Sequence, residues 1–444
     1  MLATQNGPTT RLELMERLFD ARRHSDSLLG LVRTGSLYER PISERHRIIF
    51  YLGHLEAFDW NLLHERALGL KSGHPELDRL FAFGIDPVGG GLPVDRPSDW
   101  PSLNEVRDYV NKVRIALDTK LTDETLESRN LFDGVRLSTL LNVAIEHRLM
   151  HVETLAYMLH QLPFEQKQWR SSPAANIATP PVIARMVDVP AGTAEMGLPR
   201  GGEDFGWDNE YESHRVDVPA FTIDQFKVTN RQYAEFIAAG GYETSSLWST
   251  EDWDWKTTRG ISHPVFWTRA GDGWFYRTMF DEMPLPLEWP VYLSHAEAKA
   301  YARWVGKSLP TEAEWQRAAC GLLHHDRETD LREPALAKSR IYGLDVADGN
   351  PEPVNASTQS HSIFGVHGMF GNGWEWTSSV FSPFPGFEPF RFYQGYSADF
   401  FDGKHFVMKG GSPLTAPCML RPTFRNWFQP HYQYVYAGFR CVSR

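Results

Sequence analysis

The second half of the chain contains the stretch Gly371-Asn372-Gly373-Trp374-Glu375-Trp376-Thr377. Its mixture of Gly, Asn and Trp is typical of the whole chain from Ala184 onward, where strand-like segments are short and are often interrupted by Gly, Pro, Trp or Asn. Only three segments there have a helical pattern, and they are residues 230–239, 294–305 and 311–320. So much irregular chain in one compact domain usually indicates loops that carry function.

Four further stretches accompany this one in a fixed order. They are Val189-Pro190-Ala191-Gly192 with Met196-Gly197, Phe226-Lys227-Val228-Thr229-Asn230 with Tyr233, Leu309-Pro310-Thr311-Glu312-Ala313-Glu314-Trp315, and Lys409-Gly410-Gly411-Ser412. Together they resemble the formylglycine-generating-enzyme fold, a C-type-lectin-like domain of the sulfatase-modifying-factor family. The resemblance implies such a domain over residues 185–444, and a fold alone does not determine a function.

The first 165 residues have a different pattern. Apolar residues recur at helical spacing in four segments, which predicts four long helices and an up-and-down bundle over residues 1–170. The segments are residues 10–32, 43–63, 102–117 and 138–161. Between the second and third, residues 84–100 are rich in Gly, Pro and Asp and predict a structured loop, while residues 165–181 predict a linker. The expected fold class is therefore an α+β multidomain protein.

Composition excludes several classes of function. The chain has 444 residues and a formal net charge of -11, which argues against binding nucleic acid through phosphates. No run of 18 apolar residues exists, so no membrane partner is expected. The N-terminus has no secretory signal pattern, and three widely spaced cysteines suit a reducing compartment, so a cytoplasmic location is expected.

Three histidines form a candidate metal site. His147 and His151 are four residues apart in the fourth predicted helix, which places them one turn apart on one face. His54 lies on the second predicted helix, and a facing helix of a bundle can supply a third ligand. Spacing alone is a weak signal, because the chain has 17 histidines and such a pair also arises on a solvated helix face.

A bundle with one histidine on one helix and His-x-x-x-His on another resembles the DinB-type domain. A DinB-like domain followed by a formylglycine-enzyme-like domain resembles the EgtB family of ergothioneine-type synthases. The resemblance implies that His54, His147 and His151 hold Fe(II) and that the second domain covers the active site. Imidazole also suits zinc, so the choice of iron rests on the resemblance. Glu153 is either a residue that orients a ligand or a solvated helix residue.

The segment Phe392-Tyr393-Gln394-Gly395-Tyr396-Ser397 resembles the family stretch that carries a catalytic tyrosine. The best matching position is Tyr396. A phenol near iron can donate a proton during bond formation. Tyr393 is the alternative position, and a packed aromatic side chain is the structural alternative for both.

The segment Leu420-Arg421-Pro422-Thr423-Phe424-Arg425-Asn426-Trp427 is similar to the family segment that holds hercynine, the trimethylated histidine. The resemblance implies that Asn426 binds the carboxylate of hercynine and that Trp427 receives the trimethylammonium group by cation–π attraction. Arg425 is a further candidate for substrate binding, or it anchors the loop.

Two positions depart from the family pattern. Members that use γ-glutamylcysteine have an acidic residue and an arginine where this chain has Phe428 and Tyr432. These two residues cannot form ion pairs with the charged ends of the dipeptide, so an uncharged donor is expected. The leading hypothesis is a selenoneine-type (SenA-like) reaction that joins a selenosugar to hercynine with O₂. The alternative is an EgtB-type sulfoxide synthase that uses cysteine or another thiol.

Other classes fit the sequence less well. A formylglycine-generating oxidase uses a closely spaced cysteine pair, whereas Cys418 and Cys441 are far apart in the sequence. Ovothiol-type synthases usually append a methyltransferase, for which the chain has no room after Arg444. A lectin-like binding protein would bind no iron and take up no O₂. The expected partners are therefore small molecules, namely hercynine, a selenosugar or thiol, and O₂.

Overall fold

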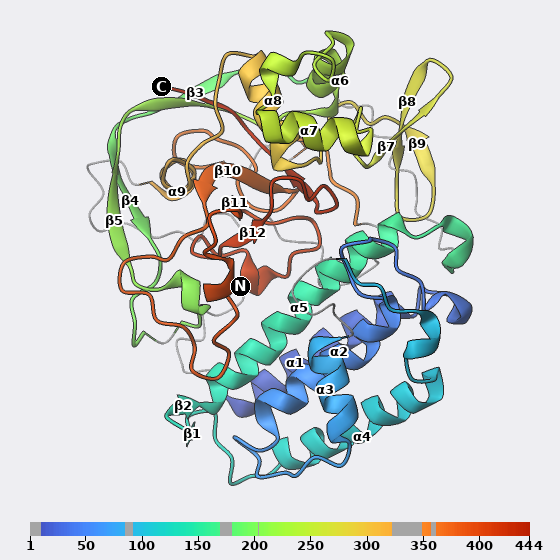
Figure 1. Cartoon of the computed structure of the whole chain (residues 1–444). Coiled ribbons are helices and arrows are strands. Elements are labelled where there is room, and N and C mark those ends of the chain that lie inside the picture. Colours follow the sequence, from blue (N-terminus) through green and yellow to red (C-terminus); the bar gives the residue numbers. More distant parts are fainter. Residues whose placement is uncertain (1–9, 85–91, 169–179, 203, 322–348, 357–360) are drawn as a thin grey trace. The chain divides into compact units, whose positions relative to one another are not determined.

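The computed structural model describes residues 10–84, 92–168, 180–202, 204–321, 349–356 and 361–444. The chain forms two compact units, Met1–Arg170 and Ser171–Arg444 (Figure 1). The first is helical and the second combines short strands with short helices, which confirms the α+β fold class. Most of the expected linker lies outside the described residues. Across the described ranges, no helix is both long and apolar enough to cross a membrane.

The first unit is built on four long helices. They are α1 (Arg11–Leu29), α2 (Ile48–Leu63), α4 (Leu103–Leu121) and α5 (Leu137–Gln161). Two begin with a capping box, in which Thr10 pairs with Glu13 and Ser102 pairs with Glu105. The longest, α5, packs against both α1 and α2. The expected bundle is therefore present.

Two details of the bundle differ from the sequence prediction. The second helix begins at Ile48, because the residues after Pro41 form turns first. A short helix, α3 (Pro75–Phe83), was missed, although Pro75 occupies its first turn and Gly84 follows its end. Of the expected 84–100 loop, residues 85–91 lie outside the described ranges, and Pro97–Asp99 forms a 3-10 turn. A small hairpin, β1 (Leu131–Phe132) with β2 (Val135–Arg136), precedes α5.

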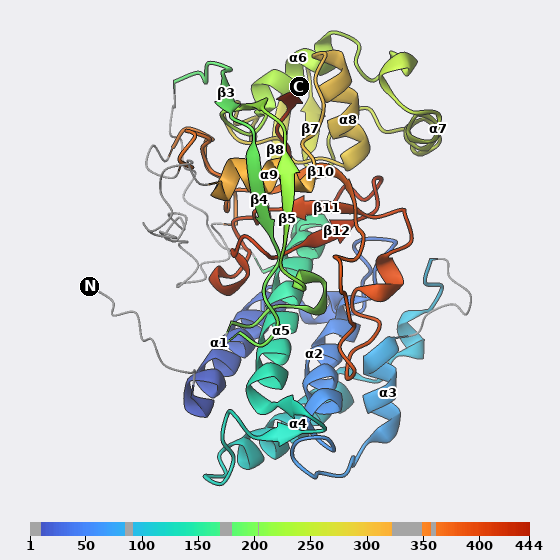
Figure 2. The same cartoon turned by 90° about the vertical axis from the view of Figure 1, so that its left-hand side faces the viewer.

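The second unit contains several small sheets (Figure 2). The central one has the order β12-β11-β10-β13, formed by Asn426–Phe428, Phe406–Lys409, Trp374–Val380 and Ala437–Gly438. A second has the order β14-β6-β3, formed by Val442–Ser443, Phe221–Asp224 and Met186–Val189. The others are the pair β4-β5 (Gly192–Met196, His214–Val218) and the three strands β7-β8-β9 (Trp267–Ala270, Gly273–Arg277, Glu282–Pro284).

Within the described residues, four helices accompany these sheets. The three that the sequence predicts are α6 (Asn230–Ala238), α8 (His295–Trp304) and α9 (Glu312–Cys320). The expectation of only three was wrong, because α7 (Thr250–Arg259) is also helical. Its N-cap is Ser249, and it is too polar to show a clear apolar stripe. Of the stretch Gly371–Thr377, the last four residues begin β10, and Trp374, Glu375, Trp376 and Thr377 are all buried.

Candidate metal centre and candidate active-site residues

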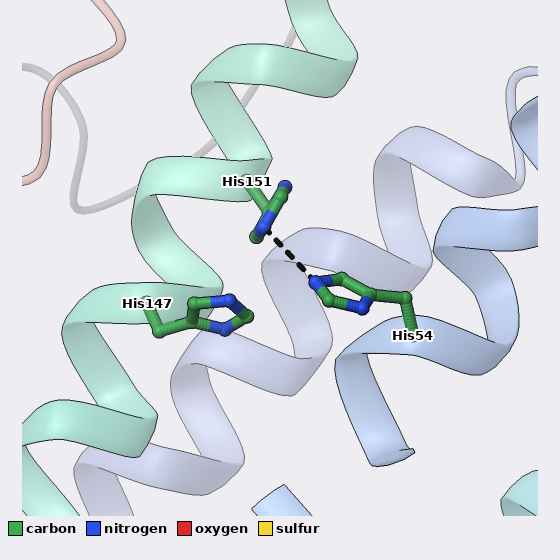
Figure 3. Close-up of side chains that lie close together, drawn as sticks. All are labelled: His54, His147 and His151. Carbon is green, nitrogen blue, oxygen red and sulfur yellow. Dashed lines mark hydrogen bonds between the residues drawn. The ribbon is translucent and has the colours of Figure 1, made fainter. Parts of the chain in front are cut away.

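Two helices of the first unit bring three histidines together (Figure 3). His54 comes from α2, and His147 and His151 come from successive turns of α5. One ring nitrogen of each lies within 4.8 Å of the others, and Nε2 of His54 is 3.3 Å from Nε2 of His151. Such spacing lets three imidazoles bind a single metal ion and leaves other coordination positions open.

Burial keeps these imidazoles neutral, which is the form that binds a metal. His54 and His147 are 9% and 4% exposed, and His151 is partly buried. Burial lowers the pKa of His54 to about 4 and holds the pKa values of His147 and His151 well below the usual range. The Nδ1 atoms of His147 and His151 are buried and have no hydrogen-bond partner within the described part of the chain. Three buried, neutral nitrogen donors therefore fit a bound divalent metal.

The orientation of His54 is set by its neighbours. Its Nδ1 lies 2.7 Å from the carbonyl oxygen of Phe81 in α3, so Nδ1–H donates there and Nε2 keeps its lone pair. Phe50 stacks on its ring at a centroid distance of 4.6 Å. Phe58 stacks on His147 at 3.4 Å. The helices thus fix the tautomer of one histidine and the ring planes of two.

A buried ion-pair network adjoins this centre. Arg148 directly follows His147 and is fully buried. Its guanidinium donates to Asp59 Oδ2 at 2.6 Å, to Glu56 Oε1 at 3.0 Å and to the carbonyl oxygen of Leu55 at 2.9 Å. All three acceptors belong to α2, so Arg148 ties α5 to the helix that carries His54. No local sequence pattern predicts this network.

The two carboxylates of the network, Glu56 and Asp59, have pKa values that are shifted in opposite directions. Burial alone would raise the pKa of Glu56, but the guanidinium groups of Arg148, Arg114 and Arg22 outweigh it and lower that pKa. Burial raises the pKa of Asp59. Glu153 is buried, which removes the alternative of a solvated helix residue.

In the second unit, Tyr396 and Trp427 belong to one aromatic cluster. Tyr396 is 9% exposed, and its ring stacks on Trp207 at 4.0 Å. Trp427 meets it edge to face at 5.4 Å, stacks in parallel on Phe381 at 4.2 Å and also lies 5.5 Å from the ring of Phe400. Tyr393 lies 5.4 Å from Tyr396, and burial, together with the charge of Asp208, raises its pKa to about 12.

The other expected substrate residues lie on or just after β12. The side chain of Asn426 accepts the backbone N–H of Trp427 at 2.9 Å and is partly exposed. Phe428 and Tyr432 stack on each other at 4.9 Å with an angle of 12° between their planes. The two departures from the family pattern thus form one aromatic pair.

Arg425 is committed to contacts within the unit. It is 2% exposed and binds Glu312 of α9 through Nε at 2.8 Å and Nη2 at 3.1 Å. Its guanidinium also lies over the ring of Phe384, 4.0 Å from the ring centroid. These contacts hold β12 to α9, and a direct contact between Arg425 and substrate stays a prediction.

Comparison with known proteins identifies the class of protein to which the chain belongs. Residues 173–444 match the sulfatase-modifying factor enzyme 1-like domain. The chain is also similar, over almost its whole length, to two hercynine oxygenases. The one from Mycolicibacterium smegmatis is 33% identical, with 93% of this chain and 96% of that protein covered. The one from Mycolicibacterium thermoresistibile is 32% identical, with 97% and 95% covered.

These matches identify the family. The chain belongs to the hercynine oxygenase family, and the EgtB-type arrangement expected from the sequence is confirmed. Ergothioneine biosynthesis protein 1 of Neurospora crassa is a further relative, 28% identical over 91% of this chain and 55% of its own length. The names of these relatives do not support a preference for selenium, and the sulfur-using alternative agrees better with them.

Proposed function

We propose that this protein is a non-haem iron(II), O₂-dependent enzyme that joins the sulfur of a thiol to the imidazole of hercynine. The observation that carries the proposal is the cluster of three neutral imidazoles on α2 and α5, in a chain that matches a hercynine oxygenase over 93% of its length. The selenium-specific reaction, which the sequence favoured, gives way to the sulfur reaction because the relatives support the latter.

His54, His147 and His151 would hold the iron. Iron(II) bound there would supply O₂ activation and open positions for substrates. The protein contributes a preorganised set of donors, since the ring of His54 is fixed by Phe81 and the ring of His147 by Phe58.

The overall chemistry balances with one molecule of O₂. The imidazole C–H and the thiol S–H are lost, a C–S bond forms, one oxygen atom becomes the sulfoxide oxygen and the other leaves as water. Tyr396 would donate its phenolic proton during this coupling. The contact between Tyr396 and Trp427 supports a common location for the proton donor and the hercynine-binding segment.

The thiol is proposed to be cysteine or another small thiol. Phe428 and Tyr432 have no charge with which to bind the ends of γ-glutamylcysteine, and their stacking makes a flat apolar surface instead. Asn426 remains the proposed partner of the hercynine carboxylate, and Trp427 that of the trimethylammonium group. Because Phe381 covers one face of Trp427, the cation would use the other.

A competition experiment tests this function. The protein is loaded with Fe(II) without oxygen and then given O₂, hercynine, and equal amounts of cysteine, γ-glutamylcysteine and a selenosugar. Mass spectrometry of the products should show a hercynine–cysteine sulfoxide as the main adduct. A selenium adduct as the main product would restore the selenoneine-type reaction. No adduct and no O₂ uptake would favour a binding protein.

A further inference from the structure

Four consecutive buried residues, Trp207-Asp208-Asn209-Glu210, form a turn in the second unit. None is more than 1% exposed, although three are polar. The last three make a 3-10 turn, η4 (Asp208–Glu210), in which the side chain of Glu210 accepts the backbone N–H of Trp207 at 2.8 Å. Buried polar groups of this kind are costly unless each has a partner, so their contacts indicate what the turn does.

Glu210 ties the turn to the segment before β12. Its carboxylate accepts two hydrogen bonds from Arg421, at 2.9 and 2.6 Å, and one from the hydroxyl of Thr423 at 2.6 Å. The carbonyl oxygen of Asn209 accepts a further bond from Arg425 at 3.2 Å. The turn is therefore fixed to the stretch that leads to Asn426 and Trp427.

The other side of the turn holds the loop that carries Tyr396. Ser397 is fully buried, and its hydroxyl donates to Oδ1 of Asp208 and accepts from Nδ2 of Asn209 at 3.0 Å. The neighbouring residue, Tyr396, stacks on Trp207 at 4.0 Å. Consecutive residues of the turn thus hold consecutive residues of the loop.

The loop lacks regular secondary structure and is held at separate points. The backbone N–H of Phe381 donates to His405, Arg425 donates to the carbonyl oxygen of Ser382 at 3.1 Å, and Asp208 also accepts a backbone hydrogen bond from Phe390. Residues 381–397, all of them described, form no helix and no strand. The place of the Tyr396 phenol therefore depends on side-chain contacts and not on a hydrogen-bonded ladder. A displacement of about 1 Å in a reacting group can cost about 100-fold in rate.

We propose that Asp208 is a positioning residue that holds the phenol of Tyr396 in place through the hydroxyl of Ser397. This inference rests on the proposed function, in which Tyr396 donates a proton. This role requires a hydrogen-bond acceptor at position 208 but no charge there, because the hydroxyl of Ser397 only has to donate its proton.

Kinetics of the iron-loaded protein test the proposal. Asp208→Ala and Ser397→Ala should each lower kcat for adduct formation about 10- to 100-fold, while iron content and the KM for hercynine stay near those of the wild type. Asp208→Asn keeps an acceptor and should recover kcat to within a few-fold of the wild type. In the Tyr396→Phe background, Asp208→Ala should cause no further loss, because it acts through the phenol.

Ser294→Ala is the matched control. Ser294 is also fully buried, and its hydroxyl donates to the buried carboxylate of Glu297 at 2.6 Å, but the pair caps α8. Its kcat should be close to that of the wild type. An adduct rate in Ser397→Ala equal to that in Ser294→Ala would overturn the proposal. A rate in Asp208→Asn as low as that in Asp208→Ala would overturn it as well.

Hydrogen exchange separates this inference from the proposed function. If the wild type forms no adduct, the proposed function fails. Hydrogen exchange of the peptide that covers residues 393–401 still reports whether Asp208 holds the loop. Faster exchange of this peptide in Asp208→Ala than in Asp208→Asn and Ser294→Ala supports the positioning role. Equal exchange in all three variants contradicts it.

Discussion

Nδ1 of His54 donates a hydrogen bond to the carbonyl oxygen of Phe81, 2.7 Å away. This bond exists because α3 approaches α2 closely at Gly53. A Cβ atom at position 53 would lie 2.4 Å from the ring of Phe81, which is closer than real atoms pack. A glycine within a helix usually costs about 1 kcal/mol relative to alanine, so its presence here indicates a packing requirement.

Gly53→Ala should therefore weaken metal binding. The new methyl group pushes Phe81 away, and the loss of its hydrogen bond to His54 should lower metal affinity about 10- to 100-fold. A metal titration of the refolded variant measures this. Gly35→Ala, where a Cβ meets nothing within 4 Å, is the control and should bind metal like the wild type. Equal affinities in the two variants would show that Phe81 does not orient His54.

Arg148→Ala should be strongly destabilising. The change leaves Asp59 buried without the guanidinium that donates to it, although Glu56 keeps its ion pair with Arg114 at 2.7 Å. Removing one partner of a buried ion pair typically costs about 3–5 kcal/mol of the free energy of unfolding. Denaturant unfolding measures it. Arg66→Ala removes a more exposed ion pair with Asp133 and should change stability by less than about 1 kcal/mol. A loss of similar size in both variants would contradict the structural role of Arg148.

Tyr396→Phe should suppress coupling by about 10²- to 10⁴-fold and leave iron bound, because it removes only the phenolic proton. Tyr393→Phe is the matched control from the same loop and should retain adduct formation. Mass spectrometry of the adduct and iron content measure both variants. The opposite pattern, with Tyr393→Phe inactive and Tyr396→Phe active, would move the proton donor to Tyr393.

The acidity of Asp208 predicts a pH effect on stability. Burial raises its pKa to about 6, against 3.8 for an ordinary aspartate. The stabilisation that protonated Asp208 gives the folded state is fully present below pH 3.8 and is lost as the pH rises through about 6. Asp208→Asn cannot ionise, so its stability relative to the wild type should increase between pH 4 and 7, by about 3 kcal/mol at most.

Asp252→Asn provides a control of opposite sign. Burial would raise the pKa of Asp252, but His431, Ser249 and Lys299 lower it more. The wild type gains stability from this carboxylate above pH 4 and loses it in acid, so the variant should be most destabilised near pH 7 and less so at low pH. Unfolding curves at several pH values measure both variants. A constant difference for Asp208→Asn would contradict its raised pKa.

Part of the centre could be predicted from the sequence. The spacing of His147 and His151 places them on one helix face whatever the tertiary structure. His54 could be chosen over His46 and His64 only through the family resemblance, because helix spacing does not show which face of α2 meets α5. In the structure, Nδ1 of His64 lies 2.8 Å from the carbonyl oxygen of Trp60 on its own helix.

The missed features depend on contacts between distant segments. From the sequence alone, Arg148 would be expected to be a solvated helix residue. In the structure it is buried, and Glu56 and Asp59 of α2 form ion pairs with it. The turn at residues 207–210 has the polar composition of an exposed loop. Its burial follows from Ser397, 188 residues from Asn209, and from Arg421, 211 residues from Glu210, and no local pattern reveals these partners.

In the proposed function, three histidines hold an iron ion that the reaction needs. The most direct measurement is the iron content of His151→Ala and His64→Ala after anaerobic loading with Fe(II), with O₂ uptake in the presence of hercynine and cysteine. His64→Ala should keep one iron per chain and take up O₂, whereas His151→Ala should lose most of both. Iron content and O₂ uptake in His151→Ala equal to those of the wild type would contradict the claim.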